Sequence, residues 1–132
     1  MRYYIDTCIW IDFFEDRKGH FGEPLGKYAS DLFTKIANTN STIVLSDVLL
    51  SELRKILGQV KKSLVNCRTL DVKGTQVQRN AAKRLSILRR LPPGDILHAI
   101  IARDTNSILI TRDKHFNRLL DICRFYKPEE LI

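Results

Sequence analysis

Apolar residues in this chain form short unbroken runs, separated by longer segments in which apolar positions recur at helical spacing. The runs at 2–5, 42–45 and 107–111 are rich in β-branched and aromatic residues, which favour strands. A short final edge strand is expected at 124–126. Strands without polar alternation are typical of a parallel sheet that is covered on both faces.

Helices are expected between the strands. The clearest lies at 25–38, where apolar residues recur every three or four positions. The Gly-containing segment 16–26 and the Pro92-Pro93-Gly94 break predict loops, and no clear element is assigned between about 63 and 72. Further helices are expected at 9–15, 47–62 (capped by Ser46 or Asp47), 75–90, 95–104 and 116–122. This alternation predicts a single α/β domain over 1–132.

Four carboxylates stand where predicted strands end or where helices follow them. Asp6 follows the first strand and Asp113 follows the strand at 107–111, while Asp95 begins a helix and Glu52 lies on the helix after the second strand. Each acid taken alone could be a helix cap or a solvated side chain. Because sites in parallel sheets form beyond the carboxyl ends of the strands, their joint occurrence predicts one shared site.

Glu52 is the most informative of these acids. On a helical wheel it lies about 40° from Val48, between Val48 and Ile56, on the apolar side. A carboxylate that is buried there must find a partner, take up a proton or bind a metal ion. Arg54 and Lys55 lie on the polar side of the wheel and are poor candidates for its partner.

The side chains near the acids suggest how the site would be supported. Thr7 and Thr111 lie beside Asp6 and Asp113 and could donate hydrogen bonds to a carboxylate. His98 is expected to be a hydrogen-bonded core residue, although its i+3 spacing would let it touch Asp95. A few carboxylates satisfy Mg²⁺ or Mn²⁺, which prefer oxygen ligands.

Other metal and cysteine chemistry is not indicated. His20, His98 and His115 do not group with one another, and His115 is expected at the surface. The three cysteines are far apart and have no spacing suited to zinc. We therefore expect Cys8, Cys67 and Cys123 to be buried free thiols.

Charge adds a reason to expect a polyanionic partner. The chain carries a net charge of +7, and between residues 54 and 90 every charged residue except Asp71 is Lys or Arg. Such a segment favours binding to a phosphate backbone, although a solvated helix surface would look similar. No run approaches the roughly 18 apolar residues of a membrane span, and no signal peptide is seen, so a cytoplasmic location is expected.

With these features the chain resembles the PIN-domain ribonucleases, especially the VapC-type toxins of prokaryotic toxin–antitoxin pairs. The resemblance rests on short motifs whose order and spacing span nearly the whole chain. They are Tyr4-Ile5-Asp6-Thr7-Cys8-Ile9-Trp10, Ser51-Glu52-Leu53, the run from Gly94-Asp95-Ile96 to Ala102, the run from Ile108 to Phe116, and Phe125-Tyr126-Lys127-Pro128-Glu129-Glu130-Leu131.

The resemblance implies a three-layer α/β/α fold with a short, mainly parallel central sheet. It also implies a Mg²⁺- or Mn²⁺-dependent endoribonuclease, commonly a homodimer that a small antitoxin protein holds inactive. Asp6, Glu52, Asp95 and Asp113 match the family's acidic quartet of catalytic metal ligands, and Thr111 matches its frequent Ser/Thr. The long segment 16–26 departs from the pattern, and the basic region does not align.

The helix at 9–15 has an unusually wide apolar surface. Ile9, Trp10, Ile11, Phe13 and Phe14 together cover about 200° of the helix, more than the roughly 100° stripe that faces a single core. An antitoxin segment or a second copy of the chain could cover the excess. The alternative is that the helix lies between the sheet and the loop 16–26.

Three functions fit these observations to different degrees. The leading hypothesis is hydrolysis of RNA phosphodiester bonds by a metal-dependent toxin. A non-catalytic RNA-binding or scaffold module with the same fold is the second, and a nuclease of RNA processing is a variant of the first. A phosphoacceptor signalling domain, with Lys114 holding the phosphoryl group, is the third, and the basic charge fits it poorly.

Overall fold

The computed structural model describes residues 1–58 and 66–132. Its strands are β1 (Arg2–Ile5), β2 (Thr42–Ser46), β3 (Arg68–Val72), β4 (Ile108–Ile110) and β5 (Phe125–Tyr126). The α-helices are α1 (Thr7–Glu15), α2 (Leu25–Asn38), α3 (Asp47–Leu57), α4 (Gln76–Arg89) and α5 (Pro93–Asp104). Two short 3₁₀ helices, η2 (Lys114–Arg118) and η3 (Pro128–Glu130), complete the described chain.

The strands form a five-stranded sheet in the order β3-β2-β1-β4-β5. Every pairing is parallel, which confirms the predicted sheet type. β1 lies at the centre, between β2 and β4, so that Tyr4 pairs with Val44 on one side and with Leu109 on the other. β2 and β3 follow on one side of β1, and β4 and β5 follow on the other. The order of the strands therefore reverses at β1, which is the topological switch point of the sheet.

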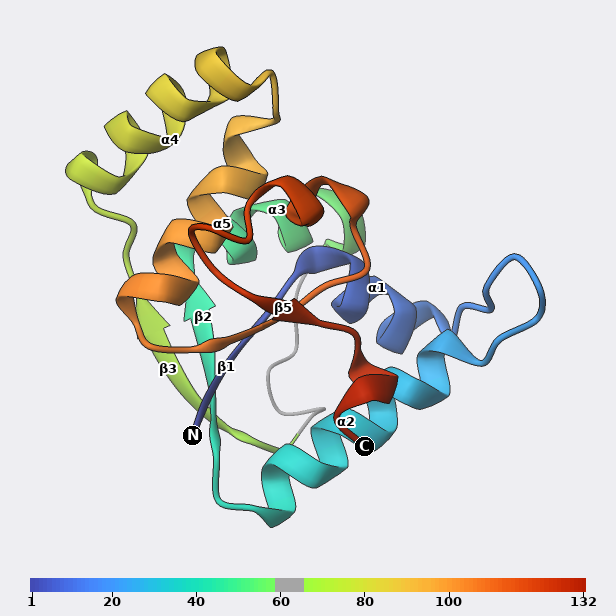
Figure 1. Ribbon diagram of the computed structural model, residues 1–132. Helices are drawn as coiled ribbons and strands as arrows, with labels where there is room; N and C mark the ends of the chain where they lie inside the picture. The colour runs from blue at the N-terminus through green and yellow to red at the C-terminus, as the bar shows by residue number, and fades with distance from the viewer. Residues whose placement is uncertain (59–65) are drawn as a thin grey trace.

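Helices cover both faces of the sheet (Figure 1). Because successive side chains of a strand point to opposite faces, Tyr3 and Ile5 pack in one core with α1, α2 and α3. Tyr4, between them, packs in the other core with α5 and η2. The three-layer α/β/α architecture is therefore confirmed. No helix in the described residues combines the length and the apolar character that a membrane crossing requires.

Two boundaries differ from the sequence prediction in the middle of the chain. The helix expected at 47–62 ends at Leu57, where Gly58 follows with a φ of 74°, a conformation that suits glycine; residues 59–62 lie outside the described residues. Ile56, expected on the buried side, is 54% exposed. In the unassigned stretch, residues Arg68–Val72 form β3, which pairs with β2 along its whole length.

Other boundaries also shift. The segment expected as a helix at 116–122 is instead the 3₁₀ helix η2, which ends at Arg118. Helix α5 begins at Pro93 rather than at Asp95, consistent with the preference of proline for the first helical turn. Asp95 therefore lies inside the first turn and is not the cap.

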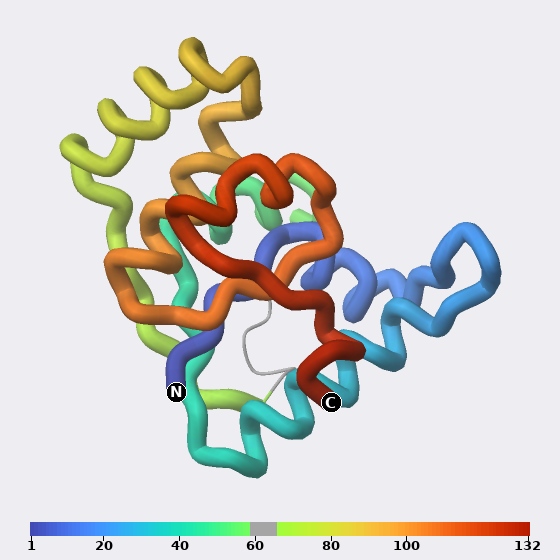
Figure 2. The backbone as a smooth tube through the Cα atoms, viewed as in Figure 1, coloured from blue at the N-terminus to red at the C-terminus, as the bar shows by residue number. Residues whose placement is uncertain are grey.

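The wide apolar surface of α1 is largely covered by the chain itself. The ring of Trp10 packs against Phe33 of α2 at a centroid distance of 4.8 Å, and Phe13 packs edge-on to the same ring at 5.0 Å. Helix α2 supplies this cover. The loop between α1 and α2 instead extends away from the sheet (Figure 1, Figure 2).

Candidate active site

The carboxyl ends of β1, β2 and β4 bring the predicted acids to one end of the sheet. Asp6 caps α1 directly after β1, and Asp113 caps η2 three residues after β4. Glu52 lies on α3, which follows β2, and Asp95 lies in the first turn of α5. The four acids therefore lie at the same end of the sheet, but their closest ligand atoms fall into two groups, Asp6 with Glu52 and Asp95 with Asp113, rather than into the single cluster that was predicted.

Thr111 connects Asp6 with Asp113. Its hydroxyl donates a hydrogen bond of 2.7 Å to Asp6 Oδ2 and accepts one of 3.1 Å from the backbone N–H of Asp113. The other Asp6 oxygen, Oδ1, accepts from the backbone N–H of Thr7 at 2.8 Å. Asp6 is 5% exposed and Thr111 is fully buried, so both side chains are held in fixed positions.

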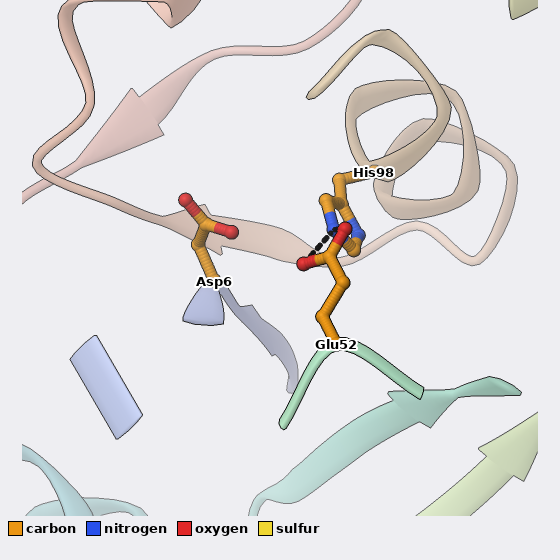
Figure 3. A group of neighbouring side chains, drawn as sticks. All are labelled: Asp6, Glu52 and His98. Carbon is orange, nitrogen blue, oxygen red and sulfur yellow. Dashed lines mark hydrogen bonds and ion pairs between the residues drawn. The ribbon is translucent and has the colours of Figure 1, made fainter. Parts of the chain in front are cut away.

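Glu52 is held by two neighbours. Thr7 Oγ1 donates to Glu52 Oε2 at 2.6 Å, and His98 Nε2 lies 3.0 Å from both carboxylate oxygens. Figure 3 shows the Glu52 side chain reaching from α3 to His98 on α5, with Asp6 beside them at the end of β1. Among the four acids, His98 therefore bonds to Glu52. The i+3 spacing on the helix would have allowed a contact with Asp95 instead.

A buried hydrogen-bonded chain continues from His98 into the core. His98 Nδ1 lies 2.5 Å from the hydroxyl of Tyr4, which lies 2.6 Å from Ser46 Oγ. Ser46 in turn caps α3 by accepting from the backbone N–H of Leu49. Tyr4, Ser46 and His98 are all at most 1% exposed. These hydrogen bonds fix the position and orientation of the imidazole that contacts Glu52.

Asp95 and Asp113 are joined by His115. The Nδ1 atom of His115 lies 2.8 Å from Asp95 Oδ2 and 3.3 Å from Asp113 Oδ1. His115 is a surface residue, as expected, with its side chain 49% exposed. The bonds to Asp95 and the negative charge of Asp113 raise the pKa of the imidazole, so a positive charge is favoured between the two acids.

The electrostatics of the acids reflect their crowding. Burial and then the negative charges of Asp113 and Asp6 raise the pKa of Asp95, against the lowering effect of the His115 hydrogen bond. For Glu52, burial would raise the pKa, but the hydrogen bonds and charge of His98 outweigh it and the pKa is lowered. Glu52 is therefore kept as a carboxylate, while Asp95 experiences the repulsion of its neighbours.

The donor atoms suit a hard divalent cation. Within residues 1–58 and 66–132, two groups have potential ligand atoms within 4.8 Å of one another; they are Asp6, Glu52 and His98, and Asp95, Asp113 and His115. Carboxylate oxygens predominate in both groups, as Mg²⁺ and Mn²⁺ require. In the first group both ring nitrogens of His98 already have partners, so His98 orients Glu52 rather than completing a nitrogen-rich site. A cation would relieve the repulsion around Asp95.

Several residues around the site were not singled out from the sequence. Asp12 of α1 is 1% exposed and pairs with both Arg17 and Arg112. Arg112 also forms a two-bond pair with Glu129 of η3, both bonds at 2.6 Å. Since Arg112 lies between Thr111 and Asp113, this network fixes the turn that carries both. The sequence did offer a signal for Asp12, because this acid stands between apolar residues of α1.

The cysteines are thiols outside disulfide bonds. All three are partly buried, less buried than predicted. Cys8 lies 3.6 Å from Asp6 Oδ2. Burial and then the charge of Asp6 raise its pKa to about 12, so the thiol stays protonated and is a poor nucleophile.

The described part of the basic segment lies on α3, β3 and α4, and at Lys73 and Arg90, which directly follow β3 and α4. Arg54, Lys55, Lys83 and Arg84 are exposed, whereas Arg79 pairs with Asp47 at 2.8 Å and Arg89 pairs with Asp121 at 2.6 Å. Lys61 and Lys62 lie outside the described residues. Part of the positive charge is therefore available to a partner and part stabilises the fold.

The chain matches the family model of the PIN domain over residues 3–120. It belongs to the PIN-domain family, whose members are generally nucleases.

Two solved structures show the same fold. One is described as VapBC2 from Rickettsia felis bound to a DNA fragment from their promoter; the match has a TM-score of 0.66 and 18% identity, covering 96% of this chain and 98% of that chain. The other is a toxin–antitoxin complex from Klebsiella pneumoniae, with a TM-score of 0.60 and 17% identity, covering 96% and 97%. No curated protein matches the chain.

Proposed function

We propose that the protein is an endoribonuclease that hydrolyses RNA phosphodiester bonds with Mg²⁺ or Mn²⁺. The observation that carries this proposal is the gathering of Asp6, Glu52, Asp95 and Asp113 at one end of the sheet of a PIN-domain protein whose net charge is +7. A basic protein that concentrates acids at one place has a use for a cation beside a polyanion.

Asp6, Glu52, Asp95 and Asp113 are the residues that would hold the ion. When bound, a divalent ion supplies charge neutralisation at the phosphate and makes water more acidic. The remaining work falls to the protein's own side chains. Thr7 and His98 hold the Glu52 carboxylate, and Thr111 holds Asp6. With their orientations fixed in advance, little reorganisation is needed when substrate arrives.

The exposed cations would bind the RNA backbone. Arg54 and Lys55 lie on α3, the helix that carries Glu52, and Lys83 lies on α4, which packs against α5. Cations at these positions would attract a phosphate chain and orient it across the acids. The binding is then expected to weaken as salt is added, because condensed counterions are released on association.

The proposal is tested by incubating the purified protein with assorted RNAs in Mg²⁺, in Mn²⁺ and in EDTA. Cleavage is expected only with a divalent ion. Asp6→Asn and Asp95→Asn are expected to keep the circular dichroism spectrum and to lose at least about 100-fold in rate, comparable to the loss of one essential electrostatic group. Asp31→Asn, which neutralises an acid on α2, serves as the matched control and should cleave normally.

Full cleavage by a folded Asp6→Asn or Asp95→Asn protein would overturn the assignment of the site. RNA binding without cleavage under any metal condition would instead favour the non-catalytic RNA-binding or scaffold module. A protein that does not bind Mn²⁺ at millimolar concentration would also favour the non-catalytic module.

The biological role that we propose is that of a toxin held inactive by a VapB-type antitoxin protein. The similar structures come from a VapBC2 complex and a toxin–antitoxin complex, which supports this role over one in RNA processing. Expression of the wild-type chain is expected to stop growth, expression of Asp95→Asn is not, and a small protein encoded beside it should restore growth. Harmless expression of an active nuclease would favour the RNA-processing role.

We also propose a homodimer. Val77, Ile87 and Leu88 on α4 are 77%, 81% and 79% exposed. Large apolar side chains that are exposed together on one helix are typical of a surface that a partner covers. Light scattering is expected to give twice the mass of one chain for the wild type, and a smaller mass for Ile87→Asp. A monomeric wild-type protein at micromolar concentration would contradict this assembly.

A further inference from the structure

A pocket of about 470 Å³ opens beside the acidic site. It is formed by the turn after β4, by η2 and the residues that follow it, by β5, and by Lys127 and Glu130 at the two ends of η3. Asp113 lines this pocket and also belongs to the group with Asp95 and His115. A molecule in the pocket would therefore lie next to whatever is bound by the acids. Its volume is in the range of small-molecule sites.

One wall of the pocket is apolar and accessible. Leu120 is 53% exposed, and Phe125 is half-buried. The Phe125 ring is held by a tilted contact with the buried ring of Phe116, at a centroid distance of 6.2 Å. A supported aromatic ring beside an exposed aliphatic side chain is the kind of surface on which a nucleobase stacks, and such stacking tolerates any base.

The rim of the pocket carries cations that are available to phosphate. Lys114 and Lys127 line it and are exposed; within the part of the chain that the structure describes, neither forms an ion pair. Arg112 is different, because its guanidinium is committed to Glu129 and Asp12. It makes the pocket floor rigid, while the two lysines are free to bind a ligand.

Two further groups give the pocket polar character. Asn117 is exposed at the rim and offers an amide that can both donate and accept hydrogen bonds. Glu130 also lines the pocket, but its carboxylate accepts from the backbone N–H of Lys127 at 3.2 Å. The acid is thus partly satisfied within η3, which lowers its repulsion of a phosphate.

We propose that this pocket binds one nucleotide of single-stranded RNA, adjacent to the phosphodiester bond that is cleaved. The base stacks on Leu120 and Phe125 beside the amide of Asn117, and the phosphates of the same nucleotide contact Lys114 and Lys127. This inference rests on the proposed ribonuclease function and extends it, because it names residues that position the substrate beside the cut.

The test measures RNA binding in proteins that cannot cut. Variants are made in an Asp95→Asn background, with Mn²⁺ present, and the binding of a fluorescent single-stranded RNA is followed by anisotropy at several salt concentrations. Leu120→Ala is expected to raise Kd about tenfold without changing the salt dependence, since it removes apolar contact with the base and no charge. Lys127→Ala is expected to lower the slope of log Kd against log salt by about 0.7.

Two controls make the test specific. Lys18→Ala removes the same charge from the loop after α1 and should change neither Kd nor the slope. RNAs that carry a single abasic nucleotide, moved along the chain, are expected to bind the Asp95→Asn parent less well when the missing base lies next to the cut site. For Leu120→Ala, removing the base next to the cut site should not change Kd, whereas removing a base elsewhere should have the same effect as in the parent.

The possible failures are distinguishable. If the wild-type protein cleaves RNA while Leu120→Ala and Lys127→Ala bind like the parent, the pocket is not a nucleotide site and the proposed function stands. If the wild-type protein neither binds nor cleaves any RNA, the ribonuclease function and the pocket assignment are both overturned.

Discussion

Glu52 shows how single residues prepare this site. Its carboxylate lies on a helix face where water is partly excluded, and its side chain is 36% exposed. Removing a carboxylate from water is costly unless hydrogen bonds replace the lost hydration. Thr7 and His98 provide them, and Tyr4 and Ser46 hold His98 in turn. We therefore regard His98 as a positioning residue for Glu52.

Replacing His98 tests this role. His98→Leu is expected to raise the Mn²⁺ concentration for half-maximal RNA cleavage by roughly 10- to 100-fold, the usual effect of removing a residue that orients a metal ligand. The rate at saturating Mn²⁺ should largely recover. His98→Gln keeps a side-chain donor and should show a smaller shift. A folded His98→Leu protein with the wild-type Mn²⁺ requirement would show that Glu52 needs no such support.

At this scale the sequence predicted where the four acids lie better than which residues contact them. Thr7 and Thr111 were expected beside the acids because they are adjacent to Asp6 and close to Asp113 in the chain. His98 is a hydrogen-bonded core residue, as expected. Its partner Glu52 was not predicted, because Glu52 reaches it from another helix, whereas spacing within one helix pointed only to Asp95. Contacts between helices depend on packing, which periodicity within one helix does not reveal.

At the scale of elements, Arg112 fastens the C-terminal helix η3 to the turn after β4. Its guanidinium makes two hydrogen bonds to Glu129 and one to the buried Asp12, and it lies over the ring of Tyr28 at 5.9 Å. Burial would raise the pKa of Glu129, but the bonds to Arg112 outweigh it and the pKa is lowered.

This pairing predicts a pH-dependent contribution to stability. Because the pKa of Glu129 is lowered from 4.5 on folding, its contribution is present above about pH 4.5 and is lost as the pH falls through the lowered value. Glu129→Gln should therefore reduce the free energy of unfolding by roughly 1–2 kcal/mol at pH 7, and the difference should shrink below pH 4.5.

Urea unfolding at several pH values measures this difference, with Glu15→Gln on α1 as the control for removing an exposed acid. A stability difference that does not change between pH 7 and pH 3 would contradict the charge-based explanation.

Ser46 joins β2 to α3 and carries a second prediction. It caps α3 and also bonds to Tyr4. Ser46→Ala is expected to lower the free energy of unfolding by about 1–3 kcal/mol, the loss of a cap and of a buried hydrogen bond together. Ser51→Ala makes the same chemical change on the exposed face of α3 and should have almost no effect. Equal urea midpoints for the two variants would contradict this account.

Most elements were predictable because the buried strands and amphipathic helices have clear patterns, and α2 was predicted with its observed bounds. The strand β3 was missed for a physical reason. It lies at the edge of the sheet, and four of its residues are exposed, so it has no apolar run to reveal it. Its position is fixed by backbone pairing with β2.

At the scale of the whole molecule, the four candidate acids lie at the switch point of the sheet. Arg54 and Lys55 are exposed on the helix that carries Glu52, and Lys114 is exposed directly after Asp113. A phosphate chain would be attracted to the surface and would meet the acids only when a cation is also present. RNA binding by the Asp95→Asn protein is therefore expected to require Mn²⁺ and to weaken steeply with salt. Equal affinity at low and high salt, measured by anisotropy, would contradict electrostatic binding.

The most direct measurement of the central claim is Mn²⁺ binding by calorimetric titration of the protein without RNA. The wild-type protein is expected to bind Mn²⁺, and Asp6→Asn and Asp95→Asn should each bind it at least about tenfold more weakly, because each removes one carboxylate from the shared site. Asp31→Asn should bind like the wild type. Undiminished Mn²⁺ binding by Asp6→Asn and Asp95→Asn would contradict a cation site shared by these acids.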